Sequence, residues 1–215
     1  MNPFVAGYRK FRKEIYPPRE QQYRALALSQ KPHTLFITCA DSRVMPTDIT
    51  QTEPGELFQC RVVGNLVPAH GNPAGGVTSA IEYSVMVLEV EHIIVCGHSD
   101  CGAMRAFSNP EKLAQLKAVQ AWIEHADSAI TLSKEHHGHL HGDQFLAALT
   151  KENVISQLQH LRTHPCVATR LRRGTLEIHG WYYDIGNGTV EHYDDDRAAF
   201  VPLDQVAEAL AGVRS

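Results

Sequence analysis

The sequence lacks a long hydrophobic run and a strong excess of either charge. No apolar stretch in its 215 residues approaches the roughly 18 that a membrane-spanning helix needs, and residues 1–10 lack the apolar segment of a secretory signal. Lys and Arg number 20 and Asp and Glu number 24, so the formal net charge is −4 and no basic face is available for nucleic acid. We therefore expect a cytoplasmic protein with neither a membrane nor a nucleic-acid partner.

Cysteine is also scarce, and its count is odd. The five cysteines are Cys39, Cys60, Cys96, Cys101 and Cys166. Because this scattered set does not resemble a disulfide framework, we expect thiols that serve packing, catalysis or metal binding. Histidine is abundant by comparison, with 13 copies. No repeat and no Gly/Ser linker divides the chain, so we expect a single domain over residues 1–215.

Short apolar runs alternate with helix-period segments along the chain. Strands are predicted over residues 34–39, 57–63, 92–96 and 176–183, and helices over 19–30, 113–132 and 144–161. A glycine-rich turn at 71–76 opens a further helix that runs through Val87. Since parallel strands need helical crossovers, the pattern predicts an α/β fold with a central, mostly parallel β-sheet flanked by helices.

Residues 1–30 are predicted to form an N-terminal helical arm. One apolar stripe consists of Phe4, Tyr8, Phe11 and Ile15, and Pro17 and Pro18 end this first helix. Such a stripe must pack on something, and packing on this protein or on a partner subunit is favoured over a basic membrane-surface helix. Residues 136–141 hold four histidines around a glycine, which we interpret as a solvated loop rather than a metal site.

Two polar motifs directly follow predicted strands. Cys39-Ala40-Asp41-Ser42-Arg43 stands at the end of the first strand, and Gly97-His98-Ser99-Asp100-Cys101-Gly102 follows the third. The carboxyl ends of parallel strands meet at one edge of a sheet, which is where open α/β folds bind ligands. We therefore expect the two motifs to form one site.

The residue types in these motifs are those of a zinc site. His98 and Cys101 can turn their donor atoms onto one ion, and Cys39 can add a third ligand. Three protein ligands leave one coordination position open, which is the catalytic pattern. A redox-active or nucleophilic cysteine, or simply buried thiols, is the alternative. For Asp41 and Arg43 the alternative is a surface ion pair worth at most about 1 kcal/mol, but beside a three-ligand zinc site we favour a catalytic role.

Together the two motifs resemble those of the β-class carbonic anhydrases, and the similarity covers nearly the whole chain. Further segments that resemble family motifs are 54–58, 64–65, 75–77 and 81–83. Segments 152–154, 163–165 and 179–181 resemble the bacterial branch, including the form encoded beside cyanate-degrading enzymes. One departure is Val62, where the family usually has Asn, and we expect it to alter local hydrogen bonding.

The resemblance implies a hydro-lyase, carbonate dehydratase, that reversibly hydrates CO₂ to bicarbonate and a proton through zinc-bound hydroxide. It implies one Zn²⁺ per subunit, held by Cys39, His98 and Cys101. Two thiolates and a neutral imidazole leave such a centre with no net charge, which acidifies water less than three histidines do. The resemblance implies that two further residues compensate for this weaker acidification. Asp41 accepts a hydrogen bond from the hydroxide, and Arg43 keeps that carboxylate ionised and turned away from the metal.

The family has two designs of active site. The allosteric design has a Trp three residues before the first cysteine, where this chain has Phe36. The open design lines its substrate pocket with Gln, Phe and Tyr, which Gln30, Phe58 and Tyr83 match, and the Gly102 N–H adds a donor. Each of these residues alone is more typical of packing. As a set they favour an open, non-allosteric site.

The resemblance also implies a homodimer or a homotetramer. The N-terminal helices would lie across the partner, and Phe58 and Tyr83 would come from the other chain. Two further functions stay open: a hydrolase of COS or CS₂ with the same zinc chemistry, or a non-catalytic zinc or redox-sensing protein. The last leaves Asp41 and Arg43 without a role, and a joint assay of zinc content and CO₂ hydration separates the possibilities.

Overall fold

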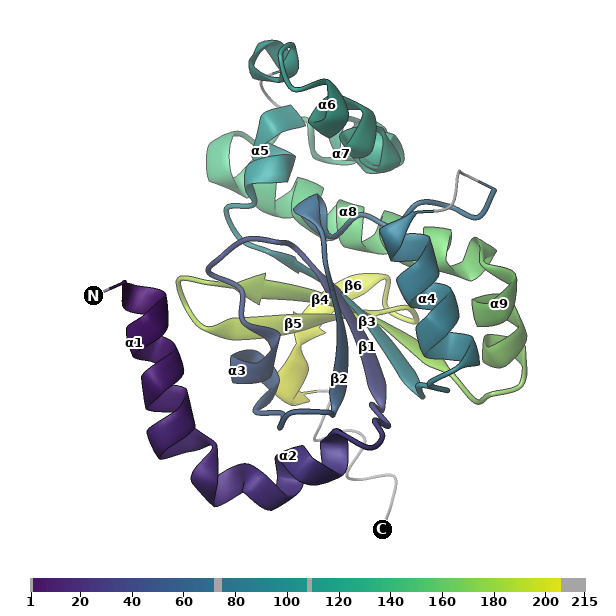
Figure 1. Ribbon diagram of the computed structural model, residues 1–215. Helices are drawn as coiled ribbons and strands as arrows, with labels where there is room; N and C mark the ends of the chain where they lie inside the picture. Colours follow the sequence, from purple (N-terminus) through teal and green to yellow (C-terminus); the bar gives the residue numbers. More distant parts are fainter. Residues whose placement is uncertain (1, 72–74, 108–109, 206–215) are drawn as a thin grey trace.

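The computed structural model describes residues 2–71, 75–107 and 110–205 of the chain. Within this part, six strands form one sheet in the order β2-β1-β3-β4-β5-β6. The first four in this order pair in parallel, and β5 and β6 complete the sheet as antiparallel strands. The predicted α/β fold, a mostly parallel sheet flanked by helices, is confirmed (Figure 1).

The strands are β1 (Thr34–Thr38), β2 (Leu57–Arg61), β3 (His92–His98), β4 (Glu177–Asp184), β5 (Thr189–Asp194) and β6 (Ala199–Pro202). The α-helices are α1 (Pro3–Lys10), α2 (Glu20–Leu26), α3 (Pro46–Thr50), α4 (Gly76–Met86), α5 (Gly102–Phe107), α6 (Lys117–Ile123), α7 (Asp127–His137), α8 (Gly142–Thr163) and α9 (Pro165–Arg172). Short 3₁₀ turns span Pro17–Arg19, Val63–Asn65, Pro110–Leu113 and Glu124–Ala126, and Phe11–Ile15 is π-helical. Each predicted strand is present, and residues 72–74 of the predicted glycine-rich turn lie outside the described residues. No helix in the described ranges is long and apolar enough to cross a membrane.

The main core lies between the sheet and helices α4, α8 and α9. Leu35 and Ile93 on the sheet pack in one cluster with Ile81 of α4, Val154 of α8 and Val167 of α9, and all five are almost fully buried. Strands β1 and β3 are covered along nearly their whole length, which explains their near-continuous apolar sequence. Burial of this kind fixes the strand ends that carry the two motifs.

Helix α8 packs directly on the backbone of β3 and β4 because glycines lie beneath it. A Cβ atom on Gly97 would lie 2.9 Å from Cγ2 of Val154, and one on Gly180 would lie 2.9 Å from Cγ1 of the same residue. Any larger side chain at either position would push α8 off the sheet. The position of His98, the residue after Gly97, therefore depends on this contact.

Strands β5 and β6 are absent from the sequence-based prediction. Asn187 and Gly188 lie in the turn after β4, and the segments that follow this turn are short, polar and only half buried. A half-buried edge strand has no continuous apolar run, so periodicity alone does not reveal it. These strands extend the sheet on the side away from β2.

The predicted helix over residues 113–132 is wrong, because the chain breaks there. It forms the 3₁₀ turn Pro110–Leu113, then α6, a second 3₁₀ turn at Glu124–Ala126, and α7. In a 3₁₀ turn residues three apart align, so Ile123 and Ala126 can both be buried. The broken geometry lets one segment fold over the edge of the sheet and bury apolar residues from each of its pieces.

The loop predicted over residues 136–141 is partly helical. Helix α7 continues through His136 and His137, and Gly138 follows as its C-cap residue. Basic side chains are favourable in the last turn of a helix, where carbonyl groups point outward. His136, His139 and His141 are exposed, in keeping with the solvated interpretation.

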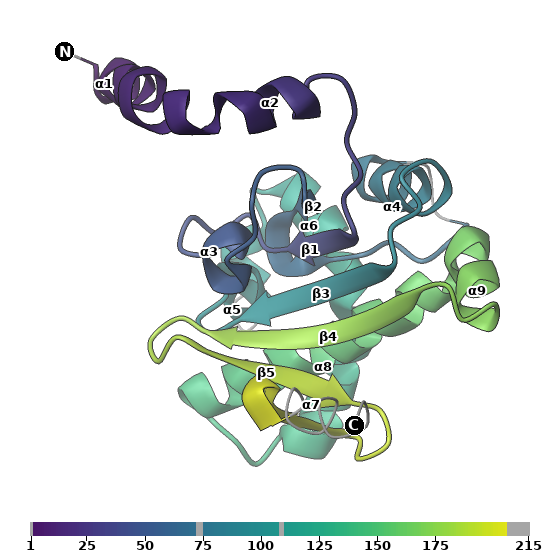
Figure 2. The ribbon, with the colours of Figure 1, turned by 90° about the horizontal axis from the view of Figure 1, so that it is seen from below.

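The N-terminal arm extends away from the rest of the chain in both ribbon views (Figures 1 and 2). Helix α2 ends at Leu26, earlier than the predicted residue 30. No residue from 2 to 26 is buried, and Phe4 and Tyr8 are 83% and 63% exposed. Phe11, Tyr16 and Tyr23 pack on one another and hold the bend between the helices. Phe4, Tyr8 and Ile15 of the apolar stripe are therefore left exposed in the described chain.

Candidate metal centre

The carboxyl ends of β1 and β3, with the segments that follow them, bring the predicted ligands together. Cys39 follows the last residue of β1, His98 is the last residue of β3, and Cys101 precedes α5. Their donor atoms all lie within 4.8 Å of one another, and all three residues are buried. This is one of two clusters of potential metal ligands among the described residues, and none of the histidines from 136 to 141 belongs to either.

The imidazole of His98 is oriented for metal binding. Its Nδ1 lies 2.9 Å from the carbonyl oxygen of Ser99. A carbonyl can only accept, so Nδ1 carries the hydrogen and Nε2 keeps its lone pair. Nε2 is buried and has no hydrogen-bond partner among the described residues. A buried polar atom without a hydrogen-bond partner costs folding free energy. A role of His98 as a metal ligand therefore explains the unpaired Nε2 better than a role in packing does.

The two thiols differ in acidity because they contact each other. A hydrogen bond from Cys101, with further help from the Gly64 N–H, lowers the pKa of the Cys39 thiol to about 4. That same hydrogen bond, together with burial, raises the pKa of the Cys101 thiol. Both can be thiolates at once only if a cation lies beside them. The donor set of two sulfurs and one imidazole nitrogen fits Zn²⁺.

The turn Val63–Asn65 supports Cys39 from the side. The Gly64 N–H points at the Cys39 Sγ from 3.4 Å, and Gly64 has the left-handed φ of 72° that favours glycine. Helix α8 holds this turn, since Asn153 Nδ2 donates to the Gly64 carbonyl at 3.1 Å. Val62 bonds only through its main chain here, donating to Thr38 O at 2.9 Å. That bond needs no polar side chain at position 62.

Asp41 and Arg43 form the predicted ion pair, next to the ligands. Arg43 donates from Nε to Asp41 Oδ1 at 2.9 Å and from Nη2 to Oδ2 at 2.8 Å, and its backbone N–H also reaches Oδ1. These bonds hold the pKa of the Asp41 carboxyl well below its usual range. Oδ2 lies 3.8 Å from His98 Nε2. The ionised Asp41 carboxylate therefore lies beside the unpartnered Nε2 of His98.

Three residues that the sequence reasoning did not identify form hydrogen bonds around this ion pair. Asp100 Oδ2 accepts from Arg43 Nη1 at 3.0 Å, and Arg105 Nη2 in turn donates to Asp100 Oδ1 at 2.6 Å. Arg61 Nη2 donates to the Asp41 carbonyl at 2.5 Å. Asp100 stands within the second motif, so its proximity to Arg43 followed from the expectation that both motifs share an edge. Nothing in the sequence pattern singles out Arg61 or Arg105.

The predicted substrate residues divide into two groups. Gly102 begins α5, directly after Cys101, and so belongs to the metal centre. Phe58 pairs with Leu35 at the start of β1, which puts it about 13 Å along the sheet from Cys39. Its ring contacts that of Tyr83 at a centroid distance of 5.9 Å. Within one chain these two rings therefore stand at the far end of β1.

Gln30 is exposed, in the segment between α2 and β1. It too lies before β1 rather than at its carboxyl end, so it does not join the metal ligands of its own chain. Phe36 is fully buried and packs edge to face on Trp181, with ring centroids 5.9 Å apart. The position that the allosteric design gives to Trp is thus part of an apolar cluster with Ile94 and Cys96.

Comparison with known proteins finds a family whose members match the part of the chain that contains both motifs. The family model described as carbonic anhydrase matches residues 34–190, which contain both motifs. A carbonic anhydrase of Pseudomonas aeruginosa is 46% identical over 211 residues, covering 98% of this chain and 96% of the relative.

Solved structures agree with the sequence comparison. The β-carbonic anhydrase CcaA superposes with a TM-score of 0.92 at 39% identity, over 94% of this chain and 91% of that one. A structure described as one of two tetrameric β-carbonic anhydrases from the ascomycete Sordaria macrospora superposes with a TM-score of 0.74 at 27% identity, over 89% and 92% of the two chains. The chain belongs to the carbonic anhydrase family, and its fold is that of the β class.

Proposed function

We propose that this chain hydrates carbon dioxide reversibly to bicarbonate and a proton, at a zinc ion held by Cys39, His98 and Cys101. The observation that carries the proposal is the unpartnered Nε2 of His98, buried among two thiols and 3.8 Å from the Asp41 carboxylate. A zinc ion with three protein ligands lowers the pKa of a water in its fourth position towards neutrality, which supplies a nucleophile.

Asp41 acts as a fixed acceptor for that water. Arg43 engages both carboxylate oxygens, so the carboxylate is ionised and cannot rotate freely. A carboxylate fixed in this way would accept a hydrogen bond from the water that the zinc ion supplies, and so would fix the orientation of that water relative to carbon dioxide. Arg43 is positioned in turn by Asp100, and Asp100 by Arg105. The chain of ion pairs thus orients the acceptor.

The same bonds support an open, non-allosteric site. The family resemblance implies that, in the allosteric design, the aspartate at the position of Asp41 can become the fourth zinc ligand. Here Arg43 makes three hydrogen bonds to the Asp41 carboxylate, counting its backbone N–H, and each favours the carboxylate remaining on Arg43. The buried phenyl ring of Phe36 occupies the position of the Trp on which the allosteric pocket depends.

We propose that the active form is a homodimer or homotetramer whose substrate pockets lie between chains. Gln30, Phe58 and Tyr83 lie far from the metal ligands of their own chain, so a second copy is needed to complete the pocket. The uncovered stripe of the arm, with Phe4 and Tyr8 exposed, suits packing on that copy. In this proposal residues 1–215 are one domain with an arm at 1–30, and the protein acts in the cytoplasm. A role linked to cyanate degradation stays a prediction.

The central test measures zinc content and stopped-flow CO₂ hydration on the same samples. Wild-type protein purified without added zinc should contain zinc at this centre and hydrate CO₂, and Cys101→Ser purified in the same way should lose the ion of this centre and the activity. Cys166→Ser, a cysteine in α9 far from the ligands in sequence, is the matched control and should keep both. Zinc-loaded protein that does not hydrate CO₂ would overturn the proposal. Hydrolysis of COS or CS₂ by that same protein would identify the alternative substrate.

A complementation experiment tests the shared pocket. Cys39→Ser removes a ligand, and Tyr83→Ala removes a pocket wall, so each variant alone should be nearly inactive. If the pocket combines Cys39 of one chain with Tyr83 of the next, a refolded equimolar mixture contains hybrid dimers with one intact site. Such a mixture should recover about a quarter of the wild-type activity. A mixture no more active than its components would contradict a pocket shared between chains.

A further inference from the structure

We propose that His92, Glu177 and His179 form a second site for a divalent transition-metal ion. The three are the other cluster of potential ligands among the described residues, with donor atoms within 4.8 Å of one another. His92 is the first residue of β3 and His98 the last, so about 20 Å of strand separates the two clusters. Figure 2 shows β3 running from the side of α4 and α9 towards α5, so the second cluster lies at the opposite end of the sheet from the metal centre.

Strand register brings the three side chains to one face of the sheet. His92 on β3 pairs directly with Glu177 on β4, so their side chains project to the same side. His179 stands two residues after Glu177 on the same strand and therefore shares that side. No loop has to move to assemble the cluster. Its geometry is set by two paired strands.

The distances match those of a metal site. His92 Nδ1 lies 3.2 Å from His179 Nε2, and Glu177 Oε2 lies 3.7 Å and 3.8 Å from these two nitrogens. The point equidistant from the three corners of this triangle lies about 2.1 Å from each atom. Zinc bonds to imidazole nitrogen measure about 2.0–2.1 Å and those to carboxylate oxygen about 2.0–2.2 Å. One ion could bind all three atoms with little movement.

The proposed ligands lie among other imidazole rings. The ring centroids of His92 and His179 are 5.3 Å apart. His192, on β5, has its ring centroid 5.9 Å from that of His179. The carboxylate of Glu177 lowers the cost of bringing a cation into this group of rings.

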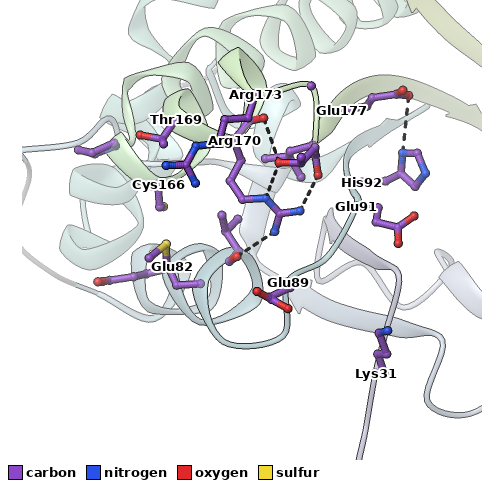
Figure 3. A pocket seen from close by; sticks show the side chains of 16 residues that line it. Lys31, Glu82, Glu89, Glu91, His92, Cys166, Thr169, Arg170, Arg173 and Glu177 are labelled. Atoms are coloured by element: carbon purple, nitrogen blue, oxygen red, sulfur yellow. Dashed lines mark hydrogen bonds and ion pairs between the residues drawn. The ribbon is translucent and has the colours of Figure 1, made fainter.

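An ion can reach the cluster from solvent. His92 and Glu177 line the edge of a cleft of about 1050 Å³ between α4, α9 and the start of β3. Figure 3 shows the two residues joined by a dashed line at the margin of this cleft. The Glu177 side chain is 70% exposed and that of His179 is 25% exposed. The second site is therefore far more open to exchange than the buried metal centre.

The ligand set defines the class of ion. Two imidazole nitrogens and one carboxylate oxygen suit Zn²⁺ and its neighbours Co²⁺, Ni²⁺ and Cu²⁺, whereas Mg²⁺ and Ca²⁺ prefer all-oxygen sites. Three protein ligands leave at least one position for water. The competing explanation is that the two imidazoles simply share a hydrogen bond, with one nitrogen donating and the other accepting.

Equilibrium dialysis against zinc chloride, followed by elemental analysis per chain, distinguishes these explanations. Wild-type protein should bind two ions at saturating zinc. His179→Gln and His92→Gln should each bind one and should hydrate CO₂ at the wild-type rate, which also shows that the variants are folded. Glu177→Gln should lose the second ion at zinc concentrations that saturate it in the wild type.

Two controls locate the second ion. His139→Gln removes an exposed histidine of residues 136–141 and should still bind two ions. Cys101→Ser should bind one, at the second site, whatever becomes of the first. A single ion per wild-type chain that is lost in Cys101→Ser, two ions in His179→Gln, or loss of the second ion in His139→Gln would each overturn the proposed site. If instead the single ion of wild-type protein survives Cys101→Ser and is lost in His179→Gln, the second site exists and the zinc centre of the proposed function fails.

Discussion

Single residues in the metal centre have separable tasks. In the proposed zinc site the sulfur and nitrogen atoms of Cys39, His98 and Cys101 would hold the ion, whereas Asp41 would not be a ligand. Its carboxylate is held by Arg43 and lies beside the ligands as an acceptor. Binding and turnover should therefore respond differently to substitutions that lie only two residues apart in sequence.

Asp41→Asn tests this separation. The amide keeps the size of the carboxylate but loses its charge and one acceptor, so it cannot direct the attacking water. We expect full zinc content with kcat lower by about a hundredfold or more. Elemental analysis and stopped-flow hydration measure the two quantities. Asp48→Asn on α3, an exposed aspartate, is the control and should change neither. Loss of zinc from Asp41→Asn would mean that the carboxylate is a ligand.

His179 gives stability a pH dependence of predictable sign. Burial, His92 and His192 lower its pKa to about 4 in the folded chain, against about 6.5 in the unfolded chain. Between these values the unfolded chain binds a proton that the folded chain does not. The contribution to stability is therefore full above pH 6.5 and is lost as the pH falls towards 4, by up to about 3 kcal/mol.

His179→Gln should remove that dependence. Free energies of unfolding in urea, measured without added metal between pH 4 and 7, should fall less steeply for this variant than for the wild type. His139→Gln, at an exposed position, should follow the wild-type curve. Parallel curves for His179→Gln and the wild type would show that His179 titrates normally in the fold.

Among the elements, α8 connects the core to the metal centre. One face of it packs on the glycines of β3 and β4, and its amides hold the turn that carries Gly64. Gln157 is fully buried, accepts from the Val67 N–H at 2.8 Å and donates to Asn153 Oδ1 at 2.9 Å. Asn153 in turn binds the Gly64 carbonyl. The helix thus supports Cys39 through a line of hydrogen bonds.

Gln157→Leu should break this line. The Val67 N–H would be left buried without its partner, which costs about 1–3 kcal/mol. Urea denaturation measures the loss of unfolding free energy, and the zinc content should fall less than the stability. Gln159→Leu changes an exposed glutamine of the same helix and serves as the control. Equal stability of the two variants would show that the buried amide contributes nothing.

The sequence predicts those elements whose apolar pattern is strong. β1 and β3 are continuous apolar runs, and α8 keeps a helical period over its whole length, so all three are predicted nearly to their ends. The chain between Leu113 and His137 has the same period but folds in pieces, because packing over the sheet edge outweighs local propensity. β5 and β6 have no strong pattern at all. Within the site, the ligands and the Asp41–Arg43 pair follow from motif spacing, whereas Arg61 and Arg105 depend on approach in space.

At the scale of the whole molecule, the N-terminal arm presents an exposed apolar surface. Phe4, Tyr8 and Ile15 are exposed on a segment in which no residue from 2 to 26 is buried. Phe58 and Tyr83 stand far from the metal ligands of their own chain. Both observations are resolved if a second copy covers the arm and contributes the two rings to the pocket.

The double variant Phe4→Ser, Tyr8→Ser should therefore weaken assembly. Losing two aromatic anchors from an interface costs about 2 kcal/mol each, which raises the dissociation constant roughly 700-fold. Light scattering after size-exclusion chromatography measures the oligomeric state. The CO₂ hydration activity should fall as the oligomer dissociates. Lys10→Ser with Lys13→Ser on the same arm is the matched control. An unchanged assembly in the aromatic variant would show that the stripe is not an interface.

The burial of the metal centre also governs how fast an ion can leave it. Cys39 and Cys101 share an apolar cluster with Leu66, Met104 and Leu149, so the donor atoms have little contact with solvent. A chelator that is much larger than carbon dioxide reaches an ion there only when the covering helices open locally. Residence time is then set by the opening rate of the fold, and at high chelator concentration the rate of zinc loss becomes independent of that concentration.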